Sequence, residues 1–259
     1  MPGNDLALLI DAAREAGRIA RGYFRRDPGI WEKPDGAGPV TEADLAVNRM
    51  LHAELGAARA DYGWLSEETP DDAARLGIER TFIIDPIDGT RAFIEGDTAW
   101  AHSLAVAEGG RVTAAVVYLP MRDALYAATE AGPALLNDAP IRASAKESAG
   151  EATLLTAKPN LAPELWKIGA PPPFTRKFRS SVAWRMCLVA EGRYDAMLTL
   201  RPSWEWDIAA GDLIARRAGA TVTDRHGGAL RFNAADPRVP GVIAGPQKLW
   251  SELHSGLIP

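Results

Sequence analysis

The sequence contains few of the residues that build disulfide frameworks or zinc sites. Its single cysteine, Cys187, cannot form an intramolecular disulfide, and the apolar residues around it predict a buried thiol. No metal-ligand spacing connects its four histidines, which are His52, His102, His226 and His254. We therefore expect no zinc site. We interpret His102 as a structural residue of a strand.

Long apolar runs and basic clusters are also absent. No apolar run approaches the roughly 20 residues that span a bilayer. The apolar residues near the N-terminus follow no basic segment, unlike those of a signal peptide. With a formal net charge of -5 and no basic run, the chain lacks the charge pattern that binds a nucleic acid polymer or an anionic membrane. We expect a cytoplasmic protein with neither partner.

What the sequence does contain is enough apolar material for a mixed α and β fold. The 259 residues are 47% hydrophobic, which suffices for a large core in one or two domains. We assign the α/β class, with an α+β domain over 1–138 and an α/β domain over 139–259. The predicted helices cover 5–25, a segment after Thr41, 181–191, 207–218 and 246–253; the predicted strands cover 81–84, 99–108, 111–118, 124–129, 153–157, 175–178, 194–200, 221–223 and 242–244; and 28–39 is predicted to be a loop.

One stretch concentrates chemical groups at the end of a strand. The β-branched and aromatic run from Thr81 to Ile84 predicts a buried strand that delivers Asp85 to its end, and Asp88 follows over a tight turn. Two carboxylates held this close repel each other unless a cation binds or a pKa rises. Gly89 lets a ligand approach the backbone, and a short helix over Thr90 to Ile94 would point free N–H groups at a phosphate.

Each carboxylate also has a simpler interpretation. An isolated Asp-x-x-Asp-Gly is most often a turn, and paired glutamates such as Glu67 and Glu68 are commonly solvated. Asp44 can close a capping box with a helix N-cap at Thr41, and Asp207 can be an N-cap itself. Haloacid-dehalogenase-type phosphatases also place aspartates before Gly-Thr. They need Asp-x-Asp, however, and proline occupies the nucleophile's position in this chain.

Four motifs in one order carry a resemblance to a known family. They are Val40-Thr41-Glu42-Ala43-Asp44, Glu67-Glu68, Asp85-Pro86-Ile87-Asp88-Gly89-Thr90 and Trp206-Asp207. With these motifs the chain resembles the inositol monophosphatase family, a branch of the fructose-bisphosphatase-like sugar phosphatases, over most of its length. The resemblance implies a layered αβαβα sandwich with the active site between its halves and a Mg²⁺-dependent phosphomonoesterase activity. A homodimer is an open alternative, because the sequence does not fix the oligomeric state.

The resemblance also implies roles for individual residues. Glu67, Asp85 and the Ile87 carbonyl would hold a first Mg²⁺, and Asp85, Asp88 and Asp207 a second, with two or three ions per site. Such an all-oxygen set suits Mg²⁺, Mn²⁺ or Ca²⁺ better than zinc or copper. The expected catalytic residues are Glu67, Asp44 and Thr90, with Asp44 hydrogen-bonded to Thr90 in addition to its role in the capping box. The expected substrate-binding residues are Asp88, Gly89, Thr90, Arg185 and Asp207.

The substrate is a small phosphorylated metabolite on this interpretation. Inositol-specific members usually carry an acidic residue seven positions before the motif aspartate, where this chain has Leu200, which we expect to line the pocket. The segment Cys187 to Gly192 is similar to bacterial 3'(2'),5'-bisphosphate nucleotidases, and Trp184 and Arg185 could meet the base and the second phosphate, although a core Trp and a solvated Arg are the simpler interpretation. We favour 3'-phosphoadenosine 5'-phosphate, with inositol-1-monophosphatase and then histidinol-phosphate phosphatase as alternatives. A non-enzymatic metal-binding interaction protein is a further alternative.

Overall fold

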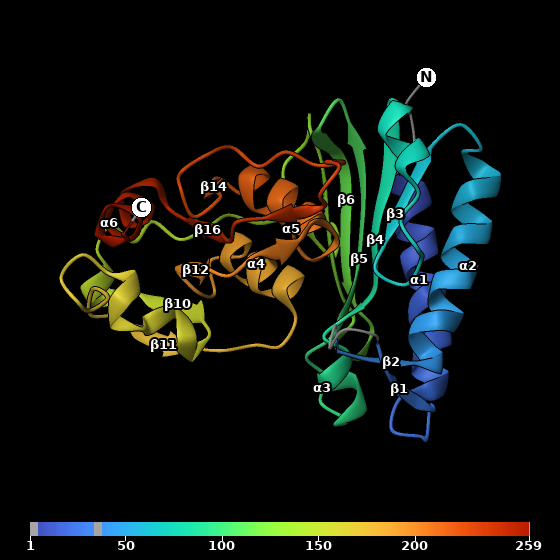
Figure 1. Cartoon of the computed structure of the whole chain (residues 1–259), viewed down its shortest axis with the longest axis horizontal. Helices are drawn as coiled ribbons and strands as arrows, with labels where there is room; N and C mark the ends of the chain where they lie inside the picture. Colours follow the sequence, from blue (N-terminus) through green and yellow to red (C-terminus); the bar gives the residue numbers. More distant parts are fainter. Residues whose placement is uncertain (1–4, 34–37, 259) are drawn as a thin grey trace.

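Five layers of helices and sheets make up the molecule (Figure 1). The computed structural model describes residues 5–33 and 38–258. Helices α1 (Asp5–Tyr23) and α2 (Glu42–Ala58) form the first layer, a seven-stranded sheet the second, and α4 (Val182–Ala190) with α5 (Glu205–Arg217) the third. A five-stranded sheet and α6 (Gln247–Gly256) complete the sandwich. The predicted α/β class and the αβαβα order are therefore confirmed.

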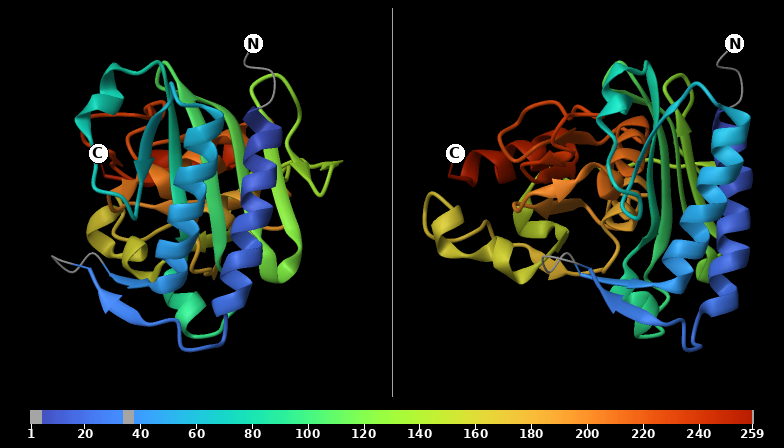
Figure 2. Two further views of the ribbon diagram at one scale, coloured as in Figure 1. Left: turned by 90° about the vertical axis from the view of Figure 1, so that its right-hand side faces the viewer. Right: turned by 45° about the vertical axis from the view of Figure 1, so that its right-hand side comes forward.

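The first two helices lie side by side over one face of the large sheet (Figure 2). Leu9, Ala13 and Ala16 recur at helical spacing on α1 and are fully buried, as the amphipathic pattern predicts. A Cβ added at Gly17 would come within 2.6 Å of the Tyr118 ring, so this glycine lets the helix approach the sheet closely. The predicted helix 5–25 is confirmed with an end two residues earlier.

The seven-stranded sheet runs in the order β3-β4-β5-β6-β7-β8-β9. Only β3 and β4 are parallel, and the predicted antiparallel meander is confirmed. The predicted strand 81–84 was too short, because pairing with β5 resumes at Asp88 beyond the proline. The strands are β3 (Gly63–Ser66), β4 (Arg80–Asp88), β5 (Ala101–Glu108), β6 (Arg111–Leu119), β7 (Ala124–Thr129), β8 (Leu135–Leu136) and β9 (Ala139–Pro140).

The five-stranded sheet is mixed, in the order β11-β10-β12-β16-β14. Strand β10 is parallel to both of its neighbours, and β16 is antiparallel to both of its own. Its strands are β10 (Thr153–Thr156), β11 (Thr175–Lys177), β12 (Ala196–Thr199), β14 (Thr221–Thr223) and β16 (Val242–Gly245). The division into domains 1–138 and 139–259 stays a prediction; β9, just after the proposed boundary, pairs with the large sheet.

Short elements that the sequence did not indicate complete the fold. A hairpin of β1 (Ile30–Glu32) and β2 (Pro39–Thr41) occupies part of the predicted loop 28–39, which is therefore partly wrong; residues 34–37 of that loop lie outside the described residues. A second antiparallel pair joins β13 (Ser203–Trp204) to β15 (Arg238–Val239). Short 3₁₀-helices span Ala73–Gly77, Pro120–Arg122, Ala149–Glu151, Lys158–Leu161 and Pro163–Leu165. The short helix α3 (Thr90–Ile94), by contrast, was predicted with these bounds and is confirmed.

Three apolar cores lie between the layers. Strand β4 contributes alternate side chains to two of these cores. Phe82 and Ile84 pack in the core below α1 and α2, and Ile83 packs in the core with α4 and α5. The third core lies between the five-stranded sheet and α6. Cys187 is buried in the central core, as predicted.

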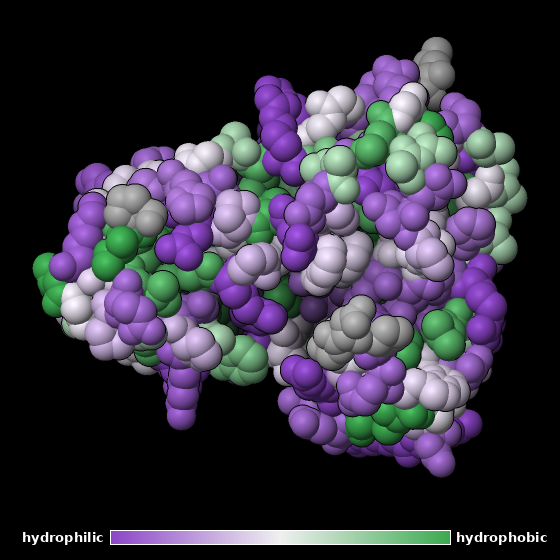
Figure 3. All heavy atoms as spheres, in the orientation of Figure 1, coloured by the Kyte–Doolittle hydropathy of each residue, from purple (hydrophilic) through white to green (hydrophobic). Residues whose placement is uncertain are grey.

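On the face in Figure 3 hydrophilic residues predominate, and apolar residues form separate small patches. Within residues 5–33 and 38–258, none of the helices combines the length and apolar character that crossing a bilayer requires.

Candidate active site

Three aspartates converge where the large sheet meets α4 and α5. Carboxylate oxygens of Asp85, Asp88 and Asp207 all lie within 4.8 Å of one another. Residues three apart on a regular strand would point to opposite faces. Between Asp85 and Asp88, however, β4 contains one residue more than β5, and this bulge restores both side chains to one side.

Asp207 reaches the cluster from the first turn of α5. The helix begins at Glu205, with Trp204 as the N-cap residue, so the interpretation of Asp207 as an N-cap is wrong. Asp207 is instead the third helical residue, and its negative charge lies near the positive end of the helix dipole. The two tryptophans flanking Glu205, Trp204 and Trp206, stack with ring centroids 4.7 Å apart.

Asp88 ties the cluster to the N-terminus of α4. One of its oxygens accepts hydrogen bonds from Ser181 Oγ and the Ala183 amide, each at 2.6 Å, and the other accepts from the Val182 amide at 3.1 Å. These donors are free because the first amides of a helix have no intrahelical partner. Gly89 adopts φ of 101°, and a Cβ there would lie 3.1 Å from the Ala99 carbonyl oxygen, so the close approach requires glycine.

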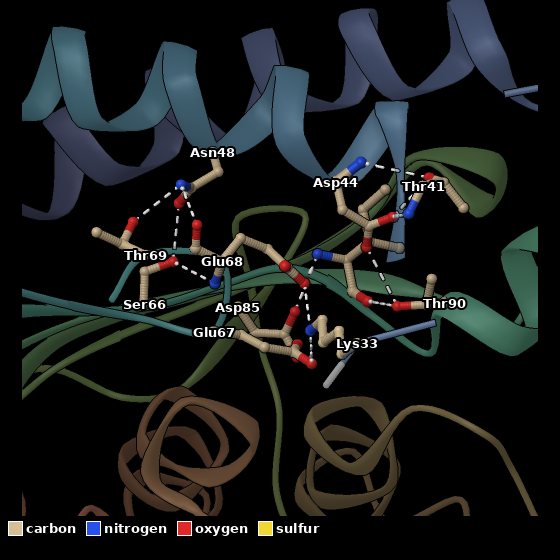
Figure 4. A network of polar contacts seen from close by, with 11 residues as sticks. Lys33, Thr41, Asp44, Asn48, Ser66, Glu67, Glu68, Thr69, Asp85 and Thr90 are labelled. Atoms are coloured by element: carbon tan, nitrogen blue, oxygen red, sulfur yellow. Dashed lines mark hydrogen bonds and ion pairs between the residues drawn. The ribbon is translucent and has the colours of Figure 1, made fainter. Parts of the chain in front are cut away.

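Asp44 holds two elements at once (Figure 4). Its Oδ2 accepts hydrogen bonds from the amide and the hydroxyl of Thr41, which closes the predicted capping box. Its Oδ1 accepts one from Thr90 Oγ1 at 3.1 Å. The Ile87 carbonyl oxygen also lies 3.1 Å from Thr90 Oγ1. The two roles weighed for Asp44 from the sequence therefore occur together.

Lys33 is a member of the site that the sequence did not reveal. Its Nζ lies 2.7 Å from a carboxylate oxygen of Glu67 and 2.6 Å from one of Glu68 (Figure 4). Glu67 stands outside the three-aspartate set, but it is near enough to raise the pKa of Asp85. The β1–β2 hairpin brings Lys33 here, and because that hairpin was taken for a loop, no sequence signal pointed to the lysine.

His102, interpreted from the sequence as a structural residue, contacts the backbone of the motif that contains Asp85 and Asp88. It is fully buried, and its Nδ1 is hydrogen-bonded to the carbonyl oxygen of Pro86. Burial lowers its pKa to about 4, so the ring is neutral at physiological pH. It therefore fixes the backbone between the two motif aspartates without adding charge.

The electrostatics of the site call for a cation. Burial raises the pKa of Asp85 well above its usual value, and the charges of Glu67 and Asp88 raise it further. Burial also raises the pKa of Asp207 well above its usual value, and the charge of Asp88 raises it further. Burial likewise raises the pKa of Asp44 to about 6. Carboxylate and carbonyl oxygens are the ligands of hard divalent cations, so the residues present fit such an ion.

An open cavity of about 370 Å³ lies beside the cluster. Glu67 lines it and connects it to the acidic site. The other residues around it are Ser66, Thr69, Asp71, Trp204, Trp206, Ala235, Asp236, Pro237 and Arg238.

Two residues expected near the substrate, Leu200 and Trp184, lie in the core. Leu200 is 5% exposed and packs in the core under α6, so it is not a pocket wall. The backbone amide of Leu200 donates a hydrogen bond to Asn160 Oδ1, which fixes the chain at this position. Trp184 is a core residue whose ring is covered by the Arg122 guanidinium at 4.6 Å, which leaves that face unavailable to a base. Arg185 is buried, so the interpretation as a solvated arginine is wrong.

The layered fold and the carboxylate-only site are those of a metal-dependent phosphatase. More narrowly, the chain belongs to the inositol monophosphatase family, whose model matches residues 4–259. Members of this family are phosphatases, which sets aside the non-enzymatic alternative.

Relatives of this chain bear different names, among them inositol-1-monophosphatase, 3'-phosphoadenosine 5'-phosphate phosphatase and Nus factor SuhB, the last in Haemophilus influenzae (strain ATCC 51907 / DSM 11121 / KW20 / Rd) at 32% identity over 98% of this chain and 96% of the relative. It is 32% identical over 263 residues to an inositol-1-monophosphatase of Rhizobium meliloti (strain 1021), covering 96% of this chain and 94% of the relative. A 3'-phosphoadenosine 5'-phosphate phosphatase of Mycobacterium leprae (strain TN) is also 32% identical, covering 92% of this chain and 88% of the relative. The solved structure of an IMPase from Thermotoga maritima superposes with a TM-score of 0.84 at 28% identity, covering 96% and 95% of the two chains.

Proposed function

We propose that the protein is a Mg²⁺-dependent phosphomonoesterase that hydrolyses a small phosphorylated metabolite with a metal-activated water. The observation that carries this proposal is the convergence of Asp85, Asp88 and Asp207 within 4.8 Å. Without a cation, two buried carboxylates and a half-buried one at this separation repel one another. The absence of nitrogen and sulfur ligands in this set favours Mg²⁺ over zinc or copper.

The residues of the cluster divide into two overlapping ligand sets. Glu67, Asp85 and the Ile87 carbonyl would hold one ion, and Asp85, Asp88 and Asp207 a second, with two or three ions in all. Bound Mg²⁺ supplies positive charge for the phosphoryl oxygens and lowers the pKa of a coordinated water. Lys33 would have to release Glu67 for the first set to form, because its Nζ now lies 2.7 Å from that carboxylate.

Thr90 and Asp44 act on the proton of the attacking water. Thr90 Oγ1 can accept that proton while its own passes toward Asp44 Oδ1, 3.1 Å away. The amides of Gly89 and Thr90 lie at the start of α3 and would donate to the phosphate. Glu67, Asp44 and Thr90 are accordingly the proposed catalytic residues.

The favoured substrate is 3'-phosphoadenosine 5'-phosphate. The Mycobacterium leprae relative with that name supports it, as does the buried cation of Arg185 near the acidic cluster. Inositol 1-phosphate is the runner-up, because the Rhizobium meliloti relative is equally similar, and histidinol phosphate is third. A homodimer and a cytoplasmic location stay predictions.

Phosphate release from these three compounds at equal concentration, with and without Mg²⁺, tests the proposal. We expect release only with Mg²⁺ and fastest from the adenosine bisphosphate. Asp85→Asn should abolish it, whereas Glu147→Gln, at an exposed carboxylate, should not. Equal release with EDTA would contradict the metal-dependent mechanism, and a preference for inositol 1-phosphate would reverse the order of the substrates.

A further inference from the structure

Helix α5 begins without the side-chain cap that usually fixes a first turn. Its N-cap residue, Trp204, makes no side-chain hydrogen bond to the free amides of that turn. The same turn nevertheless carries Asp207, whose carboxylate lies within 4.8 Å of those of Asp85 and Asp88. Helix ends fray, and the clustered carboxylates repel one another in the ion-free protein. A contact other than a cap therefore has to fix the position of Asp207.

Glu205, the first residue of this helix, supplies such contacts. It is fully buried. Its Oε2 accepts a hydrogen bond from the Asn233 amide at 2.6 Å, and its Oε1 accepts one from the Ala234 amide at 3.0 Å. Its own amide donates to the Pro237 carbonyl oxygen at 2.9 Å. Both side-chain oxygens are acceptors, as in an ionised carboxylate, so strong hydrogen bonds join the first turn of α5 to the segment 233–237.

A buried arginine holds the same segment from another element. Arg75, 2% exposed, belongs to the 3₁₀-helix Ala73–Gly77. Its Nη1 donates to Asn233 Oδ1 at 2.6 Å, and its Nη2 donates to the Ala234 carbonyl oxygen at 2.9 Å. Its Nε and Nη2 also donate to the two carboxylate oxygens of Asp71, at 2.6 and 2.8 Å. Residues 233 and 234 therefore lie between a buried cation and a buried carboxylate.

These contacts connect the two halves of the acidic site. Asp71 follows Glu67 by four residues, and both line the cavity of about 370 Å³. Asn233 is held in the left-handed conformation, with φ of 62°, which asparagine tolerates better than most residues. The path from Asp71 through Arg75 and Asn233 to Glu205 thus joins the segment that bears Glu67 to the helical turn that bears Asp207.

We infer that Glu205 is a positioning residue that holds Asp207 at the acidic cluster before an ion binds, and that Arg75 and Asn233 keep Glu205 in place. This inference rests on the proposed function, in which Asp207 binds Mg²⁺. The hydrogen bonds of Glu205 hold the first turn of α5 against the repulsion among the clustered carboxylates. Without them the turn relaxes in the empty site, and a binding ion has to restore it at the expense of its affinity.

Calorimetry with Mg²⁺ alone, on the full chain and without substrate, tests this role. The ion to follow is the one whose binding Asp207→Asn abolishes. Glu205→Gln keeps the size of the side chain but turns an NH₂ group toward one backbone amide, which breaks one of the two hydrogen bonds. We expect the Kd of that ion to rise at least ~10-fold, the equivalent of one charge-assisted hydrogen bond. Asn233→Gly keeps the left-handed backbone and loses only the side-chain contacts with Arg75, so the Kd should rise about 3-fold.

The matched control is Asp212→Asn, on the same helix. Asp212 is also a buried carboxylate bonded to an arginine, since its oxygens accept from Arg216 at 2.8 to 3.0 Å. The control should lower stability in urea unfolding but leave the Kd for Mg²⁺ unchanged, because its contacts lie within α5 and beyond the first turn. A wild-type Kd in Glu205→Gln, or an equal loss of affinity in Asp212→Asn, would overturn the inference. If Glu205→Gln does not fold, the partly exposed Asn233→Gly decides, and an unchanged Kd there overturns it.

Amide hydrogen exchange in EDTA separates this inference from the proposed function. Ile208 is the first residue whose amide can bond within α5, so its exchange rate reports the first turn with no ion present. That amide should exchange at least ~10-fold faster in Glu205→Gln than in the wild type, and at the wild-type rate in Asp212→Asn. If the wild type binds no Mg²⁺ or releases no phosphate, the proposed function fails, while the faster exchange still supports the positioning role. Wild-type exchange in Glu205→Gln would remove that role whatever the activity.

Discussion

Replacing Asp44 by asparagine separates its structural role from its proposed catalytic role. An asparagine can keep its oxygen toward the Thr41 donors and point Nδ2 at Thr90 Oγ1, which then directs its proton to the Ile87 carbonyl oxygen. Both neighbours stay hydrogen-bonded, so we expect the fold to be retained. The proton path from Thr90 to position 44 is lost, however, and kcat with saturating Mg²⁺ should fall by about 10²-fold or more.

The stability of the metal-free variant can be estimated from the pKa of Asp44. Burial raises that pKa from 3.8 to about 6. The folded carboxyl therefore binds its proton more tightly than the unfolded one, and the wild type gains stability as the pH falls from about 6 to about 4. The rise corresponds to about 3 kcal/mol of destabilisation above pH 6. Weaker hydrogen bonds to a neutral amide offset roughly 1 to 2 kcal/mol of the gain on removing the charge.

Urea unfolding in EDTA at pH 8 and pH 4.5 measures this effect. Asp44→Asn should be as stable as the wild type or up to about 2 kcal/mol more stable at pH 8, and the difference between the two proteins should shift by about 2 kcal/mol in favour of the wild type at pH 4.5, which lies above the unfolded pKa of 3.8. The exposed Asp61→Asn serves as the control and should show no shift. A wild-type kcat in Asp44→Asn, or a stability difference that does not change with pH, would refute the reasoning.

Three further changes test other parts of the site. Asp88→Asn should lower kcat at least ~100-fold while changing metal-free stability by less than about 2 kcal/mol, since a lost hydrogen bond opposes relieved repulsion; wild-type turnover would remove Asp88 from the ligands. Ca²⁺ should compete with Mg²⁺ and inhibit, because its longer bonds and looser geometry misplace the reacting groups, and family resemblance adds inhibition by Li⁺; full activity in Ca²⁺ alone would contradict this. Gly89→Ala should destabilise the protein by about 1 to 3 kcal/mol in thermal unfolding because of its positive φ and its contact with the Ala99 carbonyl, and an unchanged Tm would show that the loop relaxes.

Local patterns predicted most of the regular structure. The period of α1, the capping box at Thr41 and the alternation of the meander each depend on residues close together in the sequence, and all are found in the structure. The extension of β4 past Pro86 was missed, because its second pairing segment depends on Ala101 in another strand. Propensity alone does not reveal such a partner.

The candidate site divides in the same way. The motif aspartates and the contact from Thr90 to Asp44 were expected from the resemblance that the motifs carry. Lys33 did not, because a hairpin brings it 34 residues along the chain to Glu67. Leu200 was misplaced for a related reason: counting seven positions back from Asp207 fixes a place in the sequence, but not the direction in which the chain turns after β12.

The hydrogen bonds of Asp88 make helix α4 a participant in ion binding. Its carboxylate accepts hydrogen bonds from the amides of Val182 and Ala183 and also contributes an oxygen to the acidic cluster. An ion bound to Asp88 competes with these amides for the negative charge of the carboxylate and therefore weakens their hydrogen bonds. By thermodynamic linkage, stronger hydrogen bonds from the α4 amides weaken the binding of the ion by the same free energy. The NMR chemical shifts of these two amides, almost a hundred positions away from Asp88 in the chain, should therefore report the occupancy of the ion site.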